Sequence, residues 1–208
     1  MRTLDPVPSS AAPHWSALTD ASRMAQPELS AGDRPARRIM KLKDGRAVSL
    51  RIAASDDISA VQRFVRGLSD RSRRNRFFAP IRELSPDQLD RVTRSRLPDE
   101  LAFVAETEQG VESRIVAMAQ YVVCEPLDAE FAVVVDDAWQ RQGLGMQLFR
   151  VLAEHAARAG FATLSGFVLP DNWPMLAFLA RLDCELVTDS DPYAVRVVKR
   201  LEAHELAV

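Results

Sequence analysis

The spacing of apolar residues divides the chain into an unpatterned leader and a patterned domain. Residues 1–38 carry five prolines among alanines and serines and show no sustained apolar period. Because this composition is typical of a segment without a core, we predict a flexible, disordered leader over residues 1–38 and one folded domain over residues 39–208. With 208 residues, the chain is long enough for one well-filled domain and an appendage.

The first part of the domain is predicted to contain one strand and two helices. Residues 48–52 alternate between apolar and polar positions as a strand does. Apolar residues then recur at helical spacing over residues 58–68, after Ser55 and Asp56, which can cap a helix. A second, short helix is predicted over residues 85–93, because Ser85 can cap it and Pro86 suits its first turn.

The pattern changes after Pro98 to three apolar runs joined by short turns, which favours an antiparallel meander. The three predicted strands are residues 101–106, 115–123 and 130–135. They are followed by a helix over residues 144–159 that Gly160 closes, a strand over 163–168, a helix over 174–182 and two strands near 185–187 and 195–200. This order predicts an α/β domain with a mixed, mostly antiparallel sheet flanked by helices.

Composition and charge exclude several classes of partner. The net charge of -2 gives no field that would attract nucleic acid or an anionic membrane, so we expect neither partner. No apolar run is long enough to span a bilayer and the first residues lack a signal-peptide pattern, so we expect a cytoplasmic protein. The two cysteines and three histidines are widely spaced, so no metal site is expected, and both cysteines are expected to be buried and reduced.

The most specific chemical signal is the turn between the last strand of the meander and the helix after it. Residues 140–145 of this turn read Q-R-Q-G-L-G. Two glycines at a helix start leave backbone N–H groups open to a phosphate, with the positive end of the helix dipole behind them. A P-loop would need a lysine after the glycines, and a dinucleotide fingerprint would need a third glycine where Leu148 stands.

This strand, the Q-x-x-G-x-G turn, the helix, the next strand and a helix begun by Asn172 resemble motif A of the GNAT acyltransferases. The resemblance covers residues 48–201 and implies a GNAT-like fold in which the turn holds the pyrophosphate of acetyl-CoA, the co-substrate. The residues that it implies for acyl-CoA binding are Val133, Val135, Gln140, Arg141, Gln142, Gly143, Leu144, Gly145, Met146 and Asn172. Backbone N–H groups of Val133 or Val135 would polarise the thioester carbonyl.

Two of these residues also have an interpretation that involves no ligand. Arg141 is explained equally well as a solvated side chain. Asn172 can act as the N-cap of the helix that contains Pro174, instead of lying near the pantetheine arm.

Two further segments resemble Pat-type GNAT domains, which act as protein lysine acetyltransferases. Residues 68–78 read L-S-D-R-S-R-R-N-R-F-F and are similar to the "LS..SR..RFF" stretch of those domains. Residues 130–135, E-F-A-V-V-V, are similar to their "EFAV.V" strand, and the resemblance puts their catalytic glutamate at Glu130. The arginines of this region are expected to form a solvated face, with contacts to acidic partners or to the CoA 3′-phosphate as the alternative. They are Arg63, Arg66, Arg71, Arg73, Arg74 and Arg76.

The chemistry of amine acylation also favours Glu130. A lysine amine has an ordinary pKa near 10.4 and is protonated at pH 7, so a base must remove a proton before attack. Strand alternation directs Phe131, Val133 and Val135 to one face and Glu130 to the other. Glu130 therefore begins the strand whose far end feeds the phosphate turn, which makes it the candidate general base. The alternative is a solvated carboxylate at a strand end.

The sequence thus predicts an N-acyltransferase that moves an acetyl or other acyl group from acyl-CoA to a primary amine by direct attack with a glutamate base. A protein lysine is favoured over a small amine as the substrate. One departure from the family leaves a second interpretation open. Many GNAT enzymes carry a tyrosine seven residues after the asparagine, where this chain has Leu179. The alternative is therefore a catalytically weak GNAT domain that serves as an acyl-CoA-binding sensor or interaction module.

Overall fold

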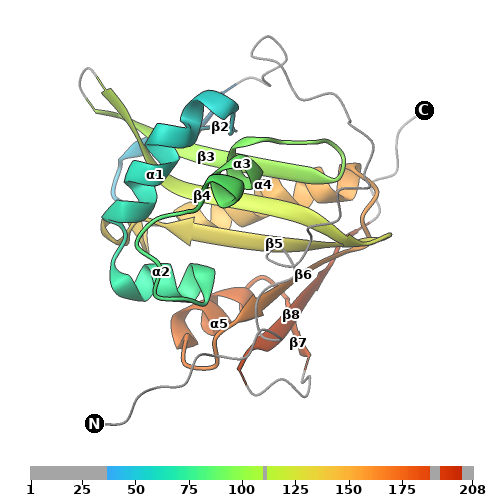
Figure 1. The fold of residues 1–208 in the computed structure, drawn as a ribbon. Coiled ribbons are helices and arrows are strands. Elements are labelled where there is room, and N and C mark those ends of the chain that lie inside the picture. The colour runs from blue at the N-terminus through green and yellow to red at the C-terminus, as the bar shows by residue number, and fades with distance from the viewer. Residues whose placement is uncertain (1–36, 110–111, 188–192, 203–208) are drawn as a thin grey trace.

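The domain is built on one eight-stranded sheet that carries helices on both faces (Figure 1). The computed structural model describes residues 37–109, 112–187 and 193–202, and the order of strands is β1-β2-β3-β4-β5-β6-β8-β7. The strands are β1 (Arg38–Lys41), β2 (Ala47–Ile52), β3 (Glu100–Gln109), β4 (Glu112–Glu125), β5 (Asp128–Val135), β6 (Thr163–Val168), β7 (Glu185–Val187) and β8 (Val195–Arg200). The helices are α1 (Ile58–Gly67), α2 (Asp70–Phe77), α3 (Pro86–Thr93), α4 (Leu144–Arg158) and α5 (Trp173–Ala180).

The sheet confirms the predicted α/β class. Neighbouring strands are antiparallel throughout except for β5 and β6, which are parallel, and β3, β4 and β5 form the predicted meander. The predicted leader lies almost wholly outside the described residues, and strand β1 begins at Arg38, so the boundary at residue 39 stays a prediction. In the described part of the chain, no helix is long and apolar enough to cross a membrane.

Two hydrophobic cores lie on opposite faces of the sheet. Helix α4 packs on one face, and α1, α2 and α3 cover the other (Figure 1). Strand β5 contributes to both because its side chains alternate: Phe131 and Val133 belong to the α4 core, whereas Val134 belongs to the α1–α3 core. The predicted alternation of this strand is therefore correct.

Local capping explains where several helices begin and end. The Ser85 side chain accepts a hydrogen bond from the Gln88 N–H and begins α3, as predicted. Gly160, at φ +93°, follows α4 in the left-handed region that favours glycine. Helix α2 was not predicted, because its sequence, D-R-S-R-R-N-R-F, has no apolar period. It begins instead at Ser69, whose hydroxyl accepts a hydrogen bond from the Ser72 N–H at 3.1 Å.

Strands β5 and β6 are paired only at their beginnings. The pairs are Asp128 with Thr163, Ala129 with Leu164 and Glu130 with Ser165. The Asp128 carboxylate strengthens this end, because it accepts hydrogen bonds from the Thr163 and Ser165 hydroxyls at 2.7 and 2.8 Å. Beyond these three pairs the strands separate.

An aromatic ring fills the point of separation. A Cβ atom built on Gly166 of β6 would lie 2.8 Å from the ring of Phe131, so the ring lies where an ordinary side chain would stand. Phe131 is held there by Phe149 of α4, edge to face at 4.9 Å between ring centroids. Glycine at position 166 therefore makes room for the Phe131 ring, an aromatic wedge on the α4 face of the sheet.

Substitution of Gly166 by alanine tests this packing. We expect Gly166→Ala to lower the free energy of unfolding by about 1–3 kcal/mol, measured by urea unfolding, because the Phe131 ring cannot move without disturbing Phe149. The second substitution Phe131→Leu should cost less in that background than in wild type. Gly67→Ala is the control, since nothing lies within 4 Å of its added Cβ. Equal stabilities of the Gly166→Ala and Gly67→Ala proteins would contradict the wedge.

Candidate active site

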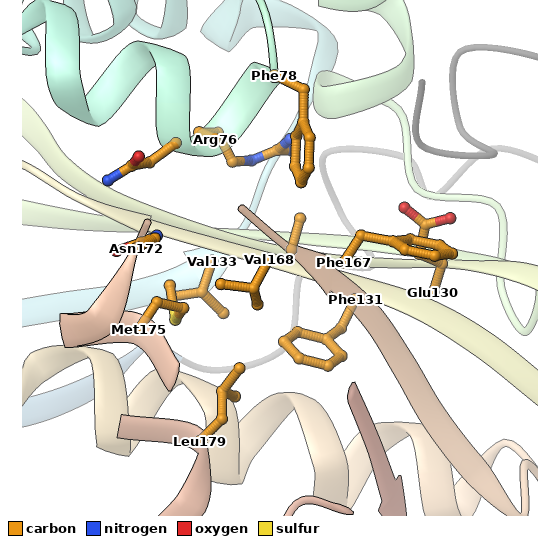
Figure 2. A pocket seen from close by; sticks show the side chains of 12 residues that line it. Arg76, Phe78, Glu130, Phe131, Val133, Phe167, Val168, Asn172, Met175 and Leu179 are labelled. Atoms are coloured by element: carbon orange, nitrogen blue, oxygen red, sulfur yellow. The ribbon is translucent and has the colours of Figure 1, made fainter. Parts of the chain in front are cut away.

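A cleft opens between β5 and β6 where the two strands separate (Figure 2). Helix α2 and the residue after it line one side, β5 and β6 form the base, and the start of α5 completes the wall. The lining residues are Asn75, Arg76, Phe78, Glu130, Phe131, Ala132, Val133, Phe167, Val168, Asn172, Met175 and Leu179. The cleft thus brings together segments from α2 to α5, which are far apart in the sequence.

The backbone of β5 presents polar groups to this cleft. The Asp136 N–H donates to the Val116 carbonyl of the β3–β4–β5 meander at 2.8 Å, so it points toward β4. Because backbone groups alternate along a strand, the N–H groups of Val135 and Val133 point the other way, toward β6. Beyond Glu130, β6 no longer pairs with them. The predicted pair Val133 and Val135 therefore lies where a ligand between the strands can accept their hydrogen bonds.

The glycine turn, residues 140–145, lies beyond the far end of strand β5. Gly143 is the N-cap residue of α4 at φ +87°, and Arg141 also has a positive φ of 61°. No side chain in the described part of the chain caps α4, so its first N–H groups are open to a ligand. Leu144 is buried beneath the turn, whereas Gly145 and Met146 are half-buried. The Arg141 side chain is exposed, as a solvated arginine or a phosphate ligand would be.

The two glutamines of the turn make structural contacts. The Gln140 side-chain amide donates to the Val135 carbonyl at 3.0 Å and to the Ser72 hydroxyl of α2 at 3.3 Å. The Gln142 carbonyl accepts a hydrogen bond from the Lys43 N–H at 3.2 Å. Gln140 therefore braces the turn against β5 and α2, and Gln142 attaches it to the β1–β2 hairpin.

Glu130 on β5 and Arg76 on α2 both line the cleft. Both side chains are buried, at 8% and 9% exposure, and Figure 2 shows the Glu130 carboxylate on the side of the sheet that carries Arg76 and Phe78. Burial lowers the pKa of Arg76 to about 10, and the negative charge of Glu130 opposes this shift. At neutral pH, Arg76 is therefore a buried cation that interacts with the Glu130 carboxylate.

The expected solvated face of arginines is wrong for Arg76. Sequence reasoning missed this residue because a helix with five charged residues in eight has no apolar stripe. The sequence feature that indicates a buried Arg76 is the pair Phe77 and Phe78 directly after it. This apolar pair anchors the end of α2 at the sheet. Arg73 is also mostly enclosed, and donates to the backbone carbonyls of Leu68 and Arg66.

Asn172 faces the cleft with its side chain. It occupies the N-cap position of α5, but the cap uses its backbone: the Asn172 carbonyl accepts from Met175 and Leu176 at 3.0 and 3.1 Å. The side chain makes no capping hydrogen bond and is only 6% exposed, so the capping interpretation of the Asn172 side chain is wrong. Leu179, fully buried on the same helix, lines the cleft with an apolar group where a tyrosine would bring a hydroxyl.

Neither cysteine lines the cleft. Cys184 is buried as predicted, but Cys124 is only half-buried, because it lies near the end of β4 beside Asp128. Burial raises the pKa of Cys124 to about 12, with a further contribution from the Asp128 charge, and burial raises that of Cys184 to about 11. Both thiols are therefore protonated at neutral pH and are weak nucleophiles.

Asp137, just before the glycine turn, joins this turn to α2. Its carboxylate accepts hydrogen bonds from the Ser69 N–H at 3.0 Å and from the Ser69 and Ser72 hydroxyls, both at 2.8 Å. Burial raises the pKa of Asp137, but these hydrogen bonds more than offset that effect and leave it below the ordinary 3.8. This attachment fixes α2, and with it Arg76, relative to the turn. In the described ranges, no group of three or more His, Cys, Asp or Glu side chains could hold a metal ion.

Comparison with known proteins is consistent with this architecture. The sequence model of the acetyltransferase (GNAT) family matches residues 68–183, more than half of the chain. This chain belongs to that family. Members of the GNAT family use acetyl-CoA as co-substrate and acylate amines, and residues 68–183 contain the lining residues of the cleft and the whole glycine turn.

Individual GNAT proteins extend the comparison. The chain is 35% identical to acetyltransferase PA5475 of Pseudomonas aeruginosa over 124 residues, which cover 59% of this chain and 67% of that protein. The crystal structure of the GNAT domain of S. lividans PAT matches 80% of this chain and 99% of its own, with a TM-score of 0.73 and 26% identity. A cAMP-binding acyltransferase from Mycobacterium smegmatis, at 21% identity and a TM-score of 0.56, shares the fold over 80% of this chain and 48% of its own.

The Asp137 attachment predicts a pH-dependent stability. A carboxyl with a lowered folded-state pKa stabilises the fold above its ordinary pKa of 3.8, and this contribution is lost as pH falls through the lower folded-state value. The free energy of unfolding of Asp137→Asn, measured by urea unfolding, should therefore be about 1 kcal/mol lower than that of wild type at pH 7. This difference between the two proteins should become smaller toward pH 3. Asp87→Asn, which removes an exposed carboxylate from α3, is the charge-matched control. A pH-independent difference would show that the Asp137 charge does not matter.

Proposed function

We propose that this protein is an acyl-CoA-dependent N-acyltransferase that transfers an acetyl or other acyl group to a primary amine, with a protein lysine as the favoured substrate. The observation that carries the proposal is the arrangement along β5. A buried carboxylate, Glu130, lies at the start of the cleft, and the uncapped glycine turn lies at the end of the same strand. One strand therefore carries the candidate base near its start and leads at its end into the candidate anion-binding helix start.

The acyl donor is expected to lie between the separated strands. Its pyrophosphate would meet the N–H groups of the turn that contains Gly143 and Gly145, and its pantetheine arm would run past Asn172. The Val133 and Val135 N–H groups point into the gap and would hydrogen-bond to the arm or to the thioester carbonyl. Phe131, Val168 and Met175 provide apolar surface for the acyl group and arm.

Glu130 would then act as the general base. It takes a proton from the incoming ammonium group, directly or through a water molecule, and the neutral amine attacks the thioester carbon. The carbon–nitrogen bond forms, the nitrogen releases its second proton to solvent, and the carbon–sulfur bond breaks. CoA leaves as a thiolate that takes a proton from solvent, and Glu130 gives its proton back to solvent. No hydroxyl assists this last step from position 179, because a leucine stands there.

Arg76 supports this role of Glu130 through its charge. A neighbouring cation favours the charged form of a buried carboxylate, which is the form that accepts a proton. Arg76 itself stays charged, because its lowered pKa of about 10 is still well above neutral pH.

The preference for a protein lysine rests on the Pat-type resemblance. The residues 68–78 that carry it form α2 and its flanks, and this segment supplies Asn75, Arg76 and Phe78 to the cleft. The GNAT domain of S. lividans PAT, with 26% identity, supports the same assignment.

The first test concerns binding to the turn. Acetyl-CoA at about a hundred times its dissociation constant should stabilise wild type by about 2.7 kcal/mol, seen as a rise in melting temperature. Gly143→Ala should reduce this rise, because alanine disfavours the left-handed conformation that shapes the turn. Gly160→Ala is matched for backbone strain, with φ +93° and open surroundings, but lies at the other end of α4. A normal acetyl-CoA shift in Gly143→Ala would refute binding at this turn.

The second test concerns the base. Glu130→Gln keeps the size of the side chain but does not accept a proton, so turnover at pH 7 should fall by roughly 10²–10⁴ while acetyl-CoA affinity stays nearly unchanged. Activity should partly return at high pH, where more of the lysine is already neutral. The assay would use acetyl-CoA with a lysine peptide library and with small amines, and would follow CoA release.

Glu125→Gln is the control for this experiment. Glu125 is an exposed carboxylate at the end of β4, close to Glu130 in sequence but not in the cleft lining. Asp128 and Asp136 are unsuitable as control positions because both have structural roles. Asp128 joins β5 to β6. Asp136 pairs with Arg114 and caps the short segment before the glycine turn. Wild-type turnover by Glu130→Gln would exclude it as the base. Acetyl-CoA binding by wild type without turnover on any amine would favour the sensor function.

A further inference from the structure

The β1–β2 hairpin is attached to the glycine turn and to the segments on either side of it. The Lys43 N–H donates to the Gln142 carbonyl at 3.2 Å, and the Gln147 side chain of α4 donates to the Lys41 carbonyl at 3.0 Å. On the other flank, the Arg46 guanidinium donates to the Ala138 carbonyl at 3.1 Å and lies 3.8 Å from the ring centroid of Trp139. The hairpin loop is therefore a fixed neighbour of the turn.

This attachment brings the Lys43 side chain to the start of α4. Its Cγ and Cε atoms lie 3.9 and 3.8 Å from a Cβ atom built on Gly143, so the aliphatic stem runs alongside the glycine. The ammonium nitrogen is bonded to Cε, so the positive charge of Lys43 lies close to Gly143, the N-cap residue of α4. Lys43 is exposed, so the charge is accessible to a ligand.

The nearby acidic group is already engaged. Asp44, the next residue, accepts hydrogen bonds from the Arg46 N–H at 3.1 Å and from the Arg46 Nε at 2.7 Å. Arg46 is in turn held by this carboxylate, the Ala138 carbonyl and Trp139. None of the ion pairs within the described ranges involves Lys43. The hairpin thus contributes one paired arginine with a structural role and one lysine whose charge adds to the field of the helix start.

We propose that Lys43 is a phosphate-binding residue that the β1–β2 hairpin contributes to the acyl-CoA site, where it contacts the pyrophosphate held by the Gly143 turn. The inference rests on the proposed function and adds to it a residue from outside the strand–turn–helix segment. A lysine ammonium provides three donors and a point charge, which suits a flexible diphosphate whose other oxygens meet backbone N–H groups. Lys43 selects the nucleotide part of the donor and takes no part in the acyl transfer.

The test measures binding of three ligands by calorimetry to wild type, Lys43→Met and Lys199→Met. The ligands are acetyl-CoA, 3′-dephospho-CoA and S-acetylpantetheine, which lacks both the pyrophosphate and the 3′-phosphate. Lys43→Met should weaken the binding of acetyl-CoA and of 3′-dephospho-CoA by the same factor, about three- to tenfold. This loss is larger than for an exposed pair of single charges, because a pyrophosphate carries two charges. Binding of S-acetylpantetheine should be unchanged. The loss should shrink at high salt, since screening removes the contribution of an exposed charge.

Lys199→Met controls for the change in net charge. Lys199 is on β8 opposite Leu164 of β6, at the end of the sheet away from the turn. Its substitution by methionine should leave the affinities for all three ligands as in wild type. A loss for acetyl-CoA that disappears with 3′-dephospho-CoA would overturn the assignment to the pyrophosphate. Wild-type affinity of Lys43→Met for acetyl-CoA would overturn this inference alone. Failure of wild type to bind acetyl-CoA at all would overturn the proposed function, and this inference with it.

Discussion

The early end of pairing between β5 and β6 is the constraint on which the site depends. A parallel pair that continued past Glu130 and Ser165 would use the backbone groups of Val133 and Val135 within the sheet. Separation leaves these groups without strand partners, and buried backbone groups require a partner. Asp128 holds the strands together before the point of separation, and the Phe131 ring packs over Gly166 just after it. The cleft is therefore a consequence of sheet geometry, and in the proposed function the acyl donor completes the hydrogen bonding of the Val133 and Val135 N–H groups.

The alternation of β5 makes this separation useful for chemistry. Phe131 and Glu130 are neighbours in sequence but face opposite sides of the sheet. The α4 face receives the apolar wedge, whereas the α2 face receives the carboxylate and its buried partner Arg76. Asp137 ties α2 to the turn, and the β1–β2 hairpin is fastened to the turn from the other flank. Contacts from two segments far apart in the sequence, α2 and the β1–β2 hairpin, thus converge on one turn.

The sequence alone predicted the elements whose pattern is local. Residues 58–68 and 144–159 show helical periods, the meander shows strands, and Ser85 and Gly160 mark helix ends; each corresponds to an element of the structure. Helix α2 escaped prediction because its cap and its packing on β5 decide its conformation, and its composition carries no apolar stripe. Strand β1 escaped because four residues at a sheet edge give too short a pattern.

The candidate site divides in the same way. Glu130 and the glycine turn were predictable because strand alternation and a strand–turn–helix order are properties of neighbouring residues. Arg76 and Lys43 were not, because their positions depend on how α2 and the β1–β2 hairpin pack on distant elements. The side chain of Asn172 was also ambiguous in sequence, since the capping residue and the cleft residue are the same, and tertiary structure alone shows where its amide points.

The apolar wall at Leu179 gives the proposed reaction a particular asymmetry. Attack requires loss of a proton from an amine with a pKa near 10.4, which is costly at neutral pH, whereas a thiol such as that of cysteine has an ordinary pKa near 8.5. A thiolate is therefore a far better leaving group than an amine anion, and its protonation follows departure without a dedicated acid. In that balance the base matters more than the acid. A cleft that retains a buried glutamate beside a buried arginine, but has leucine at position 179, is consistent with catalysis in which the amine-deprotonation step receives the protein's assistance.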